Sequence, residues 1–406
     1  MVRPSLASFL TTARAALHSS TPTPYTLLIG NEAADLDSLC SAILLAYIRT
    51  HHPASDSPLT TPALHIPIAN IPRADFALRS EFAGVLRHVG LVPATVPSLS
   101  DVLSNKEALK AESTAVILVD HNALTGPLKE LLANKVVGCI DHHVDERVVP
   151  ISTGPEPPRI IETTGSCATL VFEYVWDSWN VVMQKQQQQE EVDAHLARLA
   201  LAPIVIDTTN LGNAHKVTPR DIAAADLLEG VLRRSDASFS RDEYYNELLA
   251  LDSDLSALTP RDILRKDYKQ WEEDNGIVLG ISAVVQPIRY ISRSDGYSAF
   301  LDVVRAWAEE KSLDVAVVMT LDRPGDGSLK ARELLVWGVT DEGRRAVKEF
   351  EAQSGEFLEL QEWTEQRDGK NRDGLLRTWK QGNLAQSRKQ VAPLLRDAIS
   401  AIKEKL

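Results

Sequence analysis

The sequence is poor in cysteine, with three in 406 residues (Cys40, Cys139 and Cys167), and no two of them form a CxxC pair. This spacing excludes a disulfide framework and favours reduced core thiols in an intracellular protein. A continuous apolar run of about 18 residues is also absent, so we expect no membrane-spanning helix. Positive charge is outnumbered, with 43 Lys and Arg against 56 Asp and Glu, and the formal net charge of −13 speaks against nucleic-acid binding. A polyanionic partner would therefore need a local basic patch.

The length of the chain indicates more than one domain, because single hydrophobic cores stop growing beyond about 300 residues. The pattern of the sequence changes within residues 232–242, where the alternation of short strands with helices ends. We expect one domain over residues 1–235 and a smaller one over residues 240–406. The fold class is α/β, with a parallel sheet in the first domain, because strands interleaved with helices form βαβ units. The second domain is expected to be mixed α/β.

Hydrophobic periodicity and helix-end signals predict the individual elements. In the first half, strands are expected over Tyr25–Gly30, Ala63–Ile68, Ala115–Val119, Lys135–Ile140 and Ala202–Ile206, and helices over Asp35–Arg49, Arg73–His88, Ser166–Trp179 and Thr218–Leu232. In the second half, helices are expected over Arg241–Leu251, Pro260–Glu273, Tyr297–Glu310 and Gln386–Lys405, and strands over Ile277–Val285, Val315–Leu321 and Leu334–Val339.

Carboxylates follow four of the strands expected in the first half. They are Asp35 with Asp37, then Asp120, then Asp141 in the run Asp141–His143, and finally Asp207. In an open parallel sheet such residues gather at the carboxyl edge, where ligands bind. Carboxylate oxygens with one imidazole suit Mg²⁺, Mn²⁺ or Co²⁺. A pair of such ions serves phosphoryl hydrolysis.

Each of these residues also has an ordinary structural interpretation. Asp35 and Asp37 could cap a helix, because aspartate is favoured in a first turn. Asp120 and Asp207 could be turn residues, and the two histidines after Asp141 could be a satisfied surface pair. The joint occurrence of the carboxylates at four expected strand ends favours the metal site.

At these positions the chain resembles the DHH phosphoesterases. The four ordered motifs of that family are matched by Gly30–Asp37, Asp120–Asn122, Asp141–His143 and Ile206–Thr208. In the second half, Leu264–Lys269 and Ser387–Gln390 resemble the phosphate-binding segments of the C-terminal domain shared by family II inorganic pyrophosphatases, fungal exopolyphosphatases and prune-type proteins. The resemblance covers nearly the whole chain and implies an active site in the cleft between the two domains.

Single residues favour one branch of that family. Family II pyrophosphatases have a histidine four residues before the first metal-binding aspartate, where this chain has Asn31. Prune-type chains typically have arginine as the third residue of the DHH motif, where this chain has His143. The glycine-rich GGGH segment of the oligoribonuclease branch is missing. The chain is most similar to the fungal cytosolic exopolyphosphatases.

The resemblance implies two divalent metal ions, with Mg²⁺ or Mn²⁺ expected and Co²⁺ as a further candidate. One ion would be held by Asp35, Asp120 and Asp207 with Asn31 nearby, and the other by Asp37, Asp120, His142 and Asp207. Water between the ions would be ionised near neutral pH and attack the terminal phosphorus. The implied catalytic residues are Asp120, His142, His143 and Asp207.

The substrate-binding cations are expected in the second half. Residues 361–406 contain ten Lys or Arg against six Asp or Glu, opposite in sign to the whole chain. By resemblance, phosphate would be bound by Lys269, Arg388 and Lys389 together with His143, with Arg377 and Lys380 as further candidates. The alternative for Arg388 and Lys389 is a helix end that faces solvent.

The expected function is that of an exopolyphosphatase that releases terminal phosphate from inorganic polyphosphate. The alternatives are an inorganic pyrophosphatase, disfavoured by Asn31, and a prune-like interaction protein with weak short-chain polyphosphatase activity. We expect a cytoplasmic monomer. The segment around Arg3 and Arg14 weakly resembles a mitochondrial presequence, which would add a mitochondrial pool, although a docked N-terminal helix is the favoured interpretation.

Overall fold

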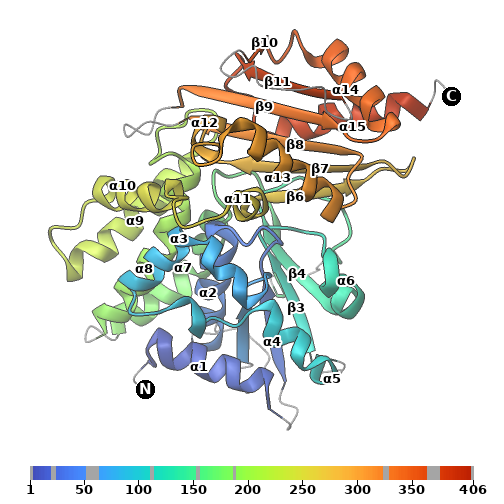
Figure 1. Ribbon diagram of the computed structural model, residues 1–406. Coiled ribbons are helices and arrows are strands. Elements are labelled where there is room, and N and C mark those ends of the chain that lie inside the picture. The colour runs from blue at the N-terminus through green and yellow to red at the C-terminus, as the bar shows by residue number, and fades with distance from the viewer. Residues whose placement is uncertain are drawn as a thin grey trace. The chain divides into compact units, whose positions relative to one another are not determined.

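The computed structural model describes residues 3–19, 24–51, 64–109, 114–151, 156–185, 189–322, 329–363 and 375–403. By its internal contacts the chain divides into two compact units, Met1–Leu251 and Asp252–Leu406 (Figure 1). The domain limits expected from the sequence, 1–235 and 240–406, stay a prediction. No described helix combines the length and the apolar character that a membrane crossing requires.

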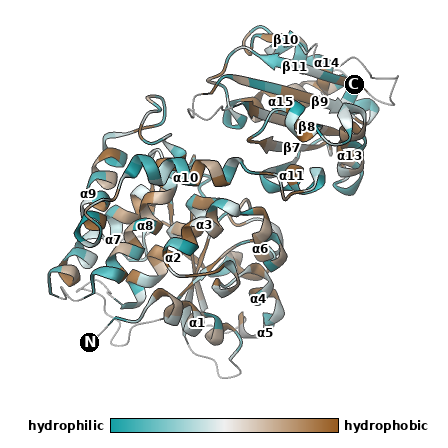
Figure 2. Cartoon of the chain, turned by 60° about the vertical axis from the view of Figure 1, so that its left-hand side comes forward, coloured by the Kyte–Doolittle hydropathy of each residue, from teal (hydrophilic) through white to brown (hydrophobic). Residues whose placement is uncertain are grey.

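The first unit is built on a five-stranded sheet with the order β2-β1-β3-β4-β5, in which every pair is parallel. Its strands are β1 (Tyr25–Ile29), β2 (Leu64–Ile68), β3 (Thr114–Val119), β4 (Val136–Asp141) and β5 (Arg159–Ile161). These strands are largely brown in Figure 2, because both faces of the sheet are covered. The expected α/β class with a parallel N-terminal sheet is confirmed.

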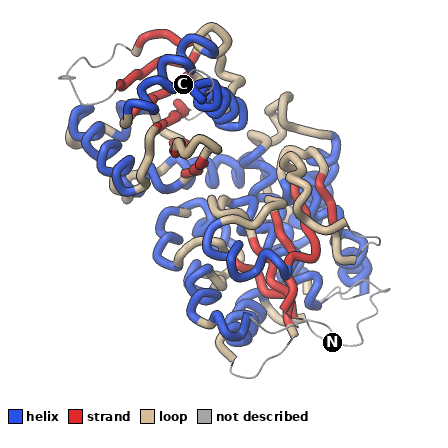
Figure 3. Tube along the Cα trace, turned by 90° about the vertical axis from the view of Figure 1, so that its right-hand side faces the viewer, coloured by secondary structure: helices blue, strands red, loops and turns tan. Residues whose placement is uncertain are grey.

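Helices surround this sheet on both faces (Figure 3). They are α1 (Leu6–Leu17), α2 (Leu36–His51), α3 (Ser80–His88), α4 (Leu99–Ser104), α5 (Lys106–Leu109), α6 (Gly126–Leu132), α7 (Cys167–Lys185), α8 (Glu190–Asp207), α9 (Pro219–Ser235) and α10 (Arg241–Ser253), with short 3₁₀ turns η1 (Arg73–Leu78), η2 (Pro93–Thr95) and η3 (Ala133–Lys135). The favoured docking of the N-terminal helix is confirmed, since the apolar side of α1 is buried.

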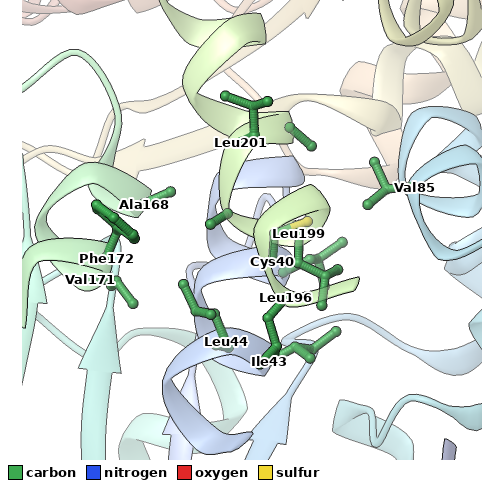
Figure 4. Close-up of a cluster of buried hydrophobic side chains, with 14 of the residues drawn as sticks. Cys40, Ile43, Leu44, Val85, Ala168, Val171, Phe172, Leu196, Leu199 and Leu201 are labelled. Atoms are coloured by element: carbon green, nitrogen blue, oxygen red, sulfur yellow. The ribbon is translucent and has the colours of Figure 1, made fainter. Parts of the chain in front are cut away.

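Side chains alternate between the two cores of this unit. On β1, Leu28 joins the core formed with α2, α7 and α8, whereas Leu27 and Ile29 join the core formed with α4 and α6. This alternation is the period of two that a strand imposes. Figure 4 shows the first of these cores, in which Ile43 of α2, Phe172 of α7 and Leu199 of α8 are labelled.

The strand expected over Ala202–Ile206 is wrong, because these residues lie in α8, which continues to Asp207. Nearly every side chain of the helix from Leu196 to Val205 is buried. A helix that is apolar all round has no visible period of 3.6, so its short β-branched segment resembled a buried strand. The fourth carboxylate therefore comes from the end of a helix.

The second unit has a six-stranded mixed sheet with the order β10-β11-β9-β8-β7-β6, in which only the described pair β7–β8 is parallel. The strands are β6 (Tyr268–Glu272), β7 (Val278–Val284), β8 (Val315–Asp322), β9 (Ala331–Gly338), β10 (Leu360–Glu362) and β11 (Leu375–Gln381). The helices are α11 (Pro260–Lys266), α12 (Ile288–Ile291), α13 (Gly296–Glu310), α14 (Asp341–Ser354) and α15 (Arg388–Lys403). Its cores place α14 and α15 on one face of the sheet and α11, α12 and α13 on the other.

The helix expected over Pro260–Glu273 is wrong in its second half. It ends at Lys266, and β6 follows as an edge strand paired with β7. Within β6, Tyr268 packs into the core of one face and Trp271 into the core of the other. The expected C-terminal helix is confirmed from Arg388 to Lys403 and begins two residues later than expected. Its last two expected positions, 404 and 405, lie outside the described residues.

Candidate metal centre

The carboxyl ends of β1, β3 and β4 bring the predicted residues to one edge of the first sheet. Asp120 follows β3 directly and Asp141 is the last residue of β4. After β1, the loop that begins at Gly30 turns into α2, and a Cβ at Gly30 would lie 2.8 Å from Cβ of Ser38. Only glycine permits this close approach, which sets the start of α2 against the site.

The two carboxylate oxygens of Asp120 differ in the number of hydrogen bonds that they accept from the described residues. Its Oδ2 accepts hydrogen bonds from Nδ2 of Asn31 and from Oγ of Ser38, both at 2.8 Å. Its Oδ1 is buried and accepts no hydrogen bond from the described residues. The backbone of Asp120 is left-handed, with φ of 63°, a conformation that aspartate tolerates better than most residues. Nε2 of His142 lies 3.4 Å from Oδ1.

The two histidines are oriented through their other ring nitrogens. Nδ1 of His142 lies 3.1 Å from the carbonyl oxygen of Thr164, and Nδ1 of His143 lies 2.8 Å from Oδ1 of Asp141. Such partners fix the ring position and the tautomer of a metal-binding or catalytic histidine. Asp120, His142 and His143 each offer a ligand atom, and these atoms lie within 4.8 Å of one another.

Asp37 and Asp35 both cap helices, as their ordinary interpretation expected. Asp35 is exposed, and its Oδ1 accepts the backbone hydrogen of Ser38 at 3.0 Å. Asp37 is buried and caps a different helix, because it accepts the backbone hydrogens of Cys167 at 2.6 Å and Ala168 at 2.8 Å, at the start of α7. Both carboxylates can still bind a cation while they cap a helix, because each carboxylate oxygen has more than one lone pair.

Asp207 is the last residue of α8, and its carboxylate is placed among the other acids. Burial and the charge of Asp37 raise the pKa of Asp207 to about 8. The ammonium of Lys216 and the imidazole of His142 act in the opposite direction. A carboxylate with its pKa raised in this way favours a proton or a bound cation.

The carboxylates of the site raise one another's pKa values, because their negative charges lie close together and are buried. Burial raises the pKa of Asp37, and Asp120 raises it further. Burial likewise raises the pKa of Asp120, with Asp35 adding to the effect. Asp141 differs, because hydrogen bonds from His143 and Asn122 outweigh the effect of burial and lower its pKa to about 2. Asp141 therefore stays ionised beside three acids, Asp37, Asp120 and Asp207, whose raised pKa values favour a proton or a cation.

The second unit holds the predicted substrate-binding residues on its sheet and at the start of α15. Arg388 donates to the backbone oxygen of Asp267 at 3.0 Å and forms an ion pair with its carboxylate at 2.8 Å. At this helix start, N and Oγ of Ser387 both donate to Oε1 of Gln390, and Oγ of Ser387 accepts the backbone hydrogen of Lys389 at 3.3 Å. The match at Ser387–Gln390 thus also has a structural explanation, and Lys389 beside it is exposed.

The other three predicted cations lie on β6 and β11. Lys269 and Arg377 belong to the same row of residues across the sheet, through Ile281, Val317 and Val336. Both therefore lie on the face covered by α14 and α15, where Arg377 pairs with Glu351 at 3.2 Å. Lys380 lies on the opposite face, because side chains alternate along β11. The five predicted cations thus do not share one face.

Several polar residues around the site were missed by sequence reasoning. Ser38 and Asn122 donate to Asp120 and Asp141, and Thr164 accepts from His142. Asp221, fully buried, accepts the backbone hydrogen of Gly165 and so holds the loop of Thr164. Of these residues, only Asn122 could have been found from the sequence, because it lies within the motif Asp120–Asn122. The others contact the site through tertiary packing, which their spacing in the sequence does not reveal.

Comparison with known proteins agrees with this geometry. A model described as the N-terminal domain of the DHH family matches residues 26–204, and one described as the DHHA2 domain matches residues 246–398. A Schizosaccharomyces pombe protein described as a "putative exopolyphosphatase" is 31% identical over 395 residues, which covers 95% of this chain and 94% of that protein. The chain belongs to the DHH family. It is accordingly an enzyme, a hydrolase of the phosphoesterase class.

Other members of the family differ in their described activities. The human protein described as exopolyphosphatase PRUNE1 is 28% identical and aligns with 97% of this chain and 79% of its own length. A manganese-dependent inorganic pyrophosphatase of Methanocaldococcus jannaschii is 27% identical, with 82% of this chain and 93% of that protein aligned. The crystal structure of a Methanococcus jannaschii "putative family II inorganic pyrophosphatase" has a TM-score of 0.56, covers 92% of this chain and 99% of its own, and is 22% identical. This last likeness shows the fold.

Proposed function

We propose that this chain is an exopolyphosphatase that removes terminal phosphate from inorganic polyphosphate. The observation that carries the proposal is Oδ1 of Asp120, a buried carboxylate oxygen that accepts no hydrogen bond from the described residues. An oxygen of this kind costs about 1–3 kcal/mol or more when it lacks a partner. A cation bound beside it, within reach of His142, would remove that cost.

The residues present fit a pair of divalent ions. Carboxylate oxygens and one imidazole nitrogen are hard or borderline donors that suit Mg²⁺, Mn²⁺ or Co²⁺. We assign Asp35, Asp120 and Asp207 to one ion and Asp37, Asp120, His142 and Asp207 to the other. Asn31 would hold Asp120 in position for metal binding, because its amide nitrogen donates to that carboxylate. Two bound ions would activate water and neutralise charge on the phosphoryl group.

The protein's own contribution to the reaction is orientation and proton transfer. Asp141 binds Nδ1 of His143, so a proton given to the leaving phosphate would come from Nε2 of that ring. Thr164 holds His142 in the same manner. In the second unit, Lys269 and Arg388 are assigned to substrate oxygens, where each would neutralise part of the polyanion.

Two features support polyphosphate over pyrophosphate as the substrate. Asn31 replaces the histidine that the related pyrophosphatases are expected to have, and relatives aligned over nearly the whole chain are described as exopolyphosphatases. A partner-binding role without catalysis is disfavoured, because every metal-binding carboxylate expected for the family is present.

A chain-length series of phosphates tests the proposal. The purified protein, supplied with Mg²⁺ or Mn²⁺, should release orthophosphate from long polyphosphate faster than from pyrophosphate. Asp120→Asn should abolish release and leave the circular dichroism spectrum unchanged, since the loss would lie in the site. Faster hydrolysis of pyrophosphate would identify a pyrophosphatase, and no hydrolysis of either would leave only the partner-binding role.

A further inference from the structure

A single peptide group links a buried carboxylate to His142. The carbonyl oxygen of Thr164 lies 3.1 Å from Nδ1 of His142, and the N–H of Gly165 donates to Oδ2 of Asp221 at 2.9 Å. That oxygen and that hydrogen belong to the same peptide bond, which is trans, so they point in opposite directions. The carboxylate, the peptide and the imidazole therefore form one continuous chain of hydrogen bonds.

Helix capping explains only some of the contacts of Asp221. At the start of α9, its Oδ2 accepts the N–H of Thr218 at 2.8 Å and the hydroxyl of Thr218 at 2.7 Å, as in a capping box. Its Oδ1 accepts the hydroxyl of Thr169 in α7 at 2.6 Å. Gly165 lies before α7, which begins at Cys167, so its N–H is not one of the helix-end groups that a cap satisfies. The contact with Gly165 therefore calls for another explanation.

The peptide between the carboxylate and the imidazole is closely packed. Asp221 is fully buried, at 0% exposure, and the hydrogen bonds that it accepts from the described residues come from backbone N–H and hydroxyl groups. A Cβ at Gly165 would lie 2.9 Å from Oδ2 of Asp221 and 2.6 Å from Cγ2 of Thr208, which directly follows Asp207. Any residue larger than glycine would therefore push this peptide out of place.

The direction of this chain of hydrogen bonds decides which nitrogen of His142 faces the site. A carbonyl oxygen only accepts, so Nδ1 carries the hydrogen and Nε2 of the neutral ring keeps its lone pair. Nε2 lies 3.4 Å from Oδ1 of Asp120. The charge of Asp221 polarises the peptide and strengthens the hydrogen bond at Nδ1, because linked hydrogen bonds reinforce one another in a buried place. A carboxylate that binds a histidine directly has this effect in many metal sites.

We propose that Asp221 is a positioning residue that acts through the Thr164–Gly165 peptide and holds His142 in the orientation and tautomer that bind a metal ion. The proposal rests on the proposed function, which assigns His142 to a metal ion. The competing role of Asp221 is structural alone, namely to cap α9 and to bind that helix to α7. The two roles differ in whether the effect of Asp221 on metal binding passes through His142.

A double-mutant cycle separates the two roles. The dissociation constant for Mn²⁺ is measured by calorimetry for wild type, Asp221→Asn, His142→Ala and the variant with both changes, and each melting temperature is recorded. Asparagine has nearly the size of aspartate and still offers an oxygen to the N–H of Gly165. The substitution therefore removes the charge and keeps most of the packing.

Asp101→Asn is the matched control. Asp101 is also buried and holds the same position in a capping box, at the start of α4. It binds residues that are not part of the site: Ser98, Arg14, His18 and Arg73. This control loses a buried capping carboxylate of the same unit without touching the peptide at Gly165.

Positioning through His142 predicts that Asp221→Asn weakens Mn²⁺ binding about ten-fold. The same substitution should have no further effect once residue 142 is alanine, because both changes would remove one and the same interaction. Asp101→Asn should lower the melting temperature and keep the Mn²⁺ affinity of wild type. Unchanged Mn²⁺ affinity in Asp221→Asn, or an equal loss with and without His142, would show a structural role and overturn the proposal.

A second measurement needs no variant of Asp221 and stays informative if Asp221→Asn does not fold. In wild type labelled with ¹⁵N-histidine and loaded with Mg²⁺, nitrogen NMR should find the hydrogen of His142 on Nδ1 alone, with the signal assigned by its loss in His142→Ala. A hydrogen on Nε2, alone or in addition, would overturn the proposal.

Polyphosphate hydrolysis, assayed separately, distinguishes failure of this proposal from failure of the proposed function. If Mn²⁺ binding depends on Asp221 through His142 but wild type releases no phosphate, the exopolyphosphatase assignment fails and the role of Asp221 stands. If wild type hydrolyses polyphosphate and its Mn²⁺ affinity does not depend on Asp221, only the role of Asp221 fails. If wild type binds no Mn²⁺, both fail.

Discussion

The side-chain amide of Asn31 donates a 2.8 Å hydrogen bond to Oδ2 of Asp120. Its oxygen accepts the backbone hydrogen of Ala34 at 3.1 Å. Both polar atoms of the amide are therefore used within the chain, one by the central carboxylate and one by the loop after β1. In this arrangement Asn31 positions Asp120 and fixes the loop that leads to Asp35.

Replacing Asn31 by histidine should strengthen metal binding. An imidazole nitrogen is a better ligand than a neutral amide for Mn²⁺ or Co²⁺. We expect the apparent dissociation constant for Mn²⁺ to fall ten-fold or more in a chelator titration, with activity shifted toward pyrophosphate. Asn31→Ala serves as the control, because it removes the amide and adds no ligand. Equal Mn²⁺ affinity of wild type and Asn31→His would show that residue 31 does not lie beside an ion.

Replacing Asp141 by asparagine should impair catalysis more than metal binding. The carboxylate is charged above about pH 2, since hydrogen bonds from His143 and Asn122 outweigh burial and lower its pKa. The amide would no longer hold Nδ1 of His143 as a charged acceptor, so we expect kcat to fall about 10–100-fold. Glu146→Gln, at an exposed position of the loop that follows, is the matched control and should retain wild-type kcat. A two-fold loss or less in Asp141→Asn would remove His143 from the proposed proton transfer.

Arg388→Ala and Lys269→Ala should each lower kcat/KM on polyphosphate about ten-fold. Each removes a charge-assisted contact worth roughly 1.5–3 kcal/mol. Lys348→Ala, an exposed lysine on α14, is the control. Arg388 also pairs with Asp267 and could stabilise the fold through that contact. The melting temperature of Arg388→Ala is therefore measured too, and we expect it to equal that of wild type. A loss of activity that tracks a loss of stability would assign Arg388 a structural role.

Asp101 is expected to stabilise the first unit in a pH-dependent manner. Burial alone would raise the pKa of Asp101, but hydrogen bonds from Ser98, His18 and Arg14 outweigh it and hold that pKa well below its usual range. The stabilisation is therefore complete above the unfolded pKa of about 3.9 and is lost as the pH falls toward the lower folded value. We expect Asp101→Asn to lower the free energy of unfolding by roughly 2 kcal/mol at pH 7.

Urea denaturation from pH 8 to pH 3 measures the difference in the free energy of unfolding between wild type and Asp101→Asn. This difference should stay constant down to about pH 5 and shrink below about pH 4. Asp177→Asn, on the exposed side of α7, should change stability by less than about 0.5 kcal/mol throughout. A difference between wild type and Asp101→Asn that grows as the pH falls would contradict the role given to Asp101.

The sequence predicted three of the four carboxylate positions together with their strands. β1, β3 and β4 have clear apolar runs, and the loop residues that follow each strand are forced to the same sheet edge. Asp207 was expected after a strand but ends helix α8, which is buried on nearly all sides in its second half and contains Pro203. Neither composition nor period distinguishes such a helix from a strand.

The contacts that orient the site residues could not be predicted from the sequence. Asp221 holds Gly165 across 56 positions of the chain, and Ser38 binds Asp120 across 82. Nothing in local spacing shows that these pairs meet, because tertiary packing alone brings them together. Arg388 is a further example. Its motif predicted phosphate binding, but the sequence did not indicate its ion pair with Asp267, which only the structure shows.

The most direct test of the central claim is a time course of long-chain polyphosphate digestion, with products resolved on a gel. An enzyme that takes one terminal phosphoryl group at a time should release orthophosphate from the first time point while the remaining polymer shortens only gradually. The rate should fall steeply with added salt, because attraction between the polyanion and the cations of the chain is largely Coulombic. Fragments of intermediate length that appear before orthophosphate would show internal cutting and would contradict the exopolyphosphatase assignment.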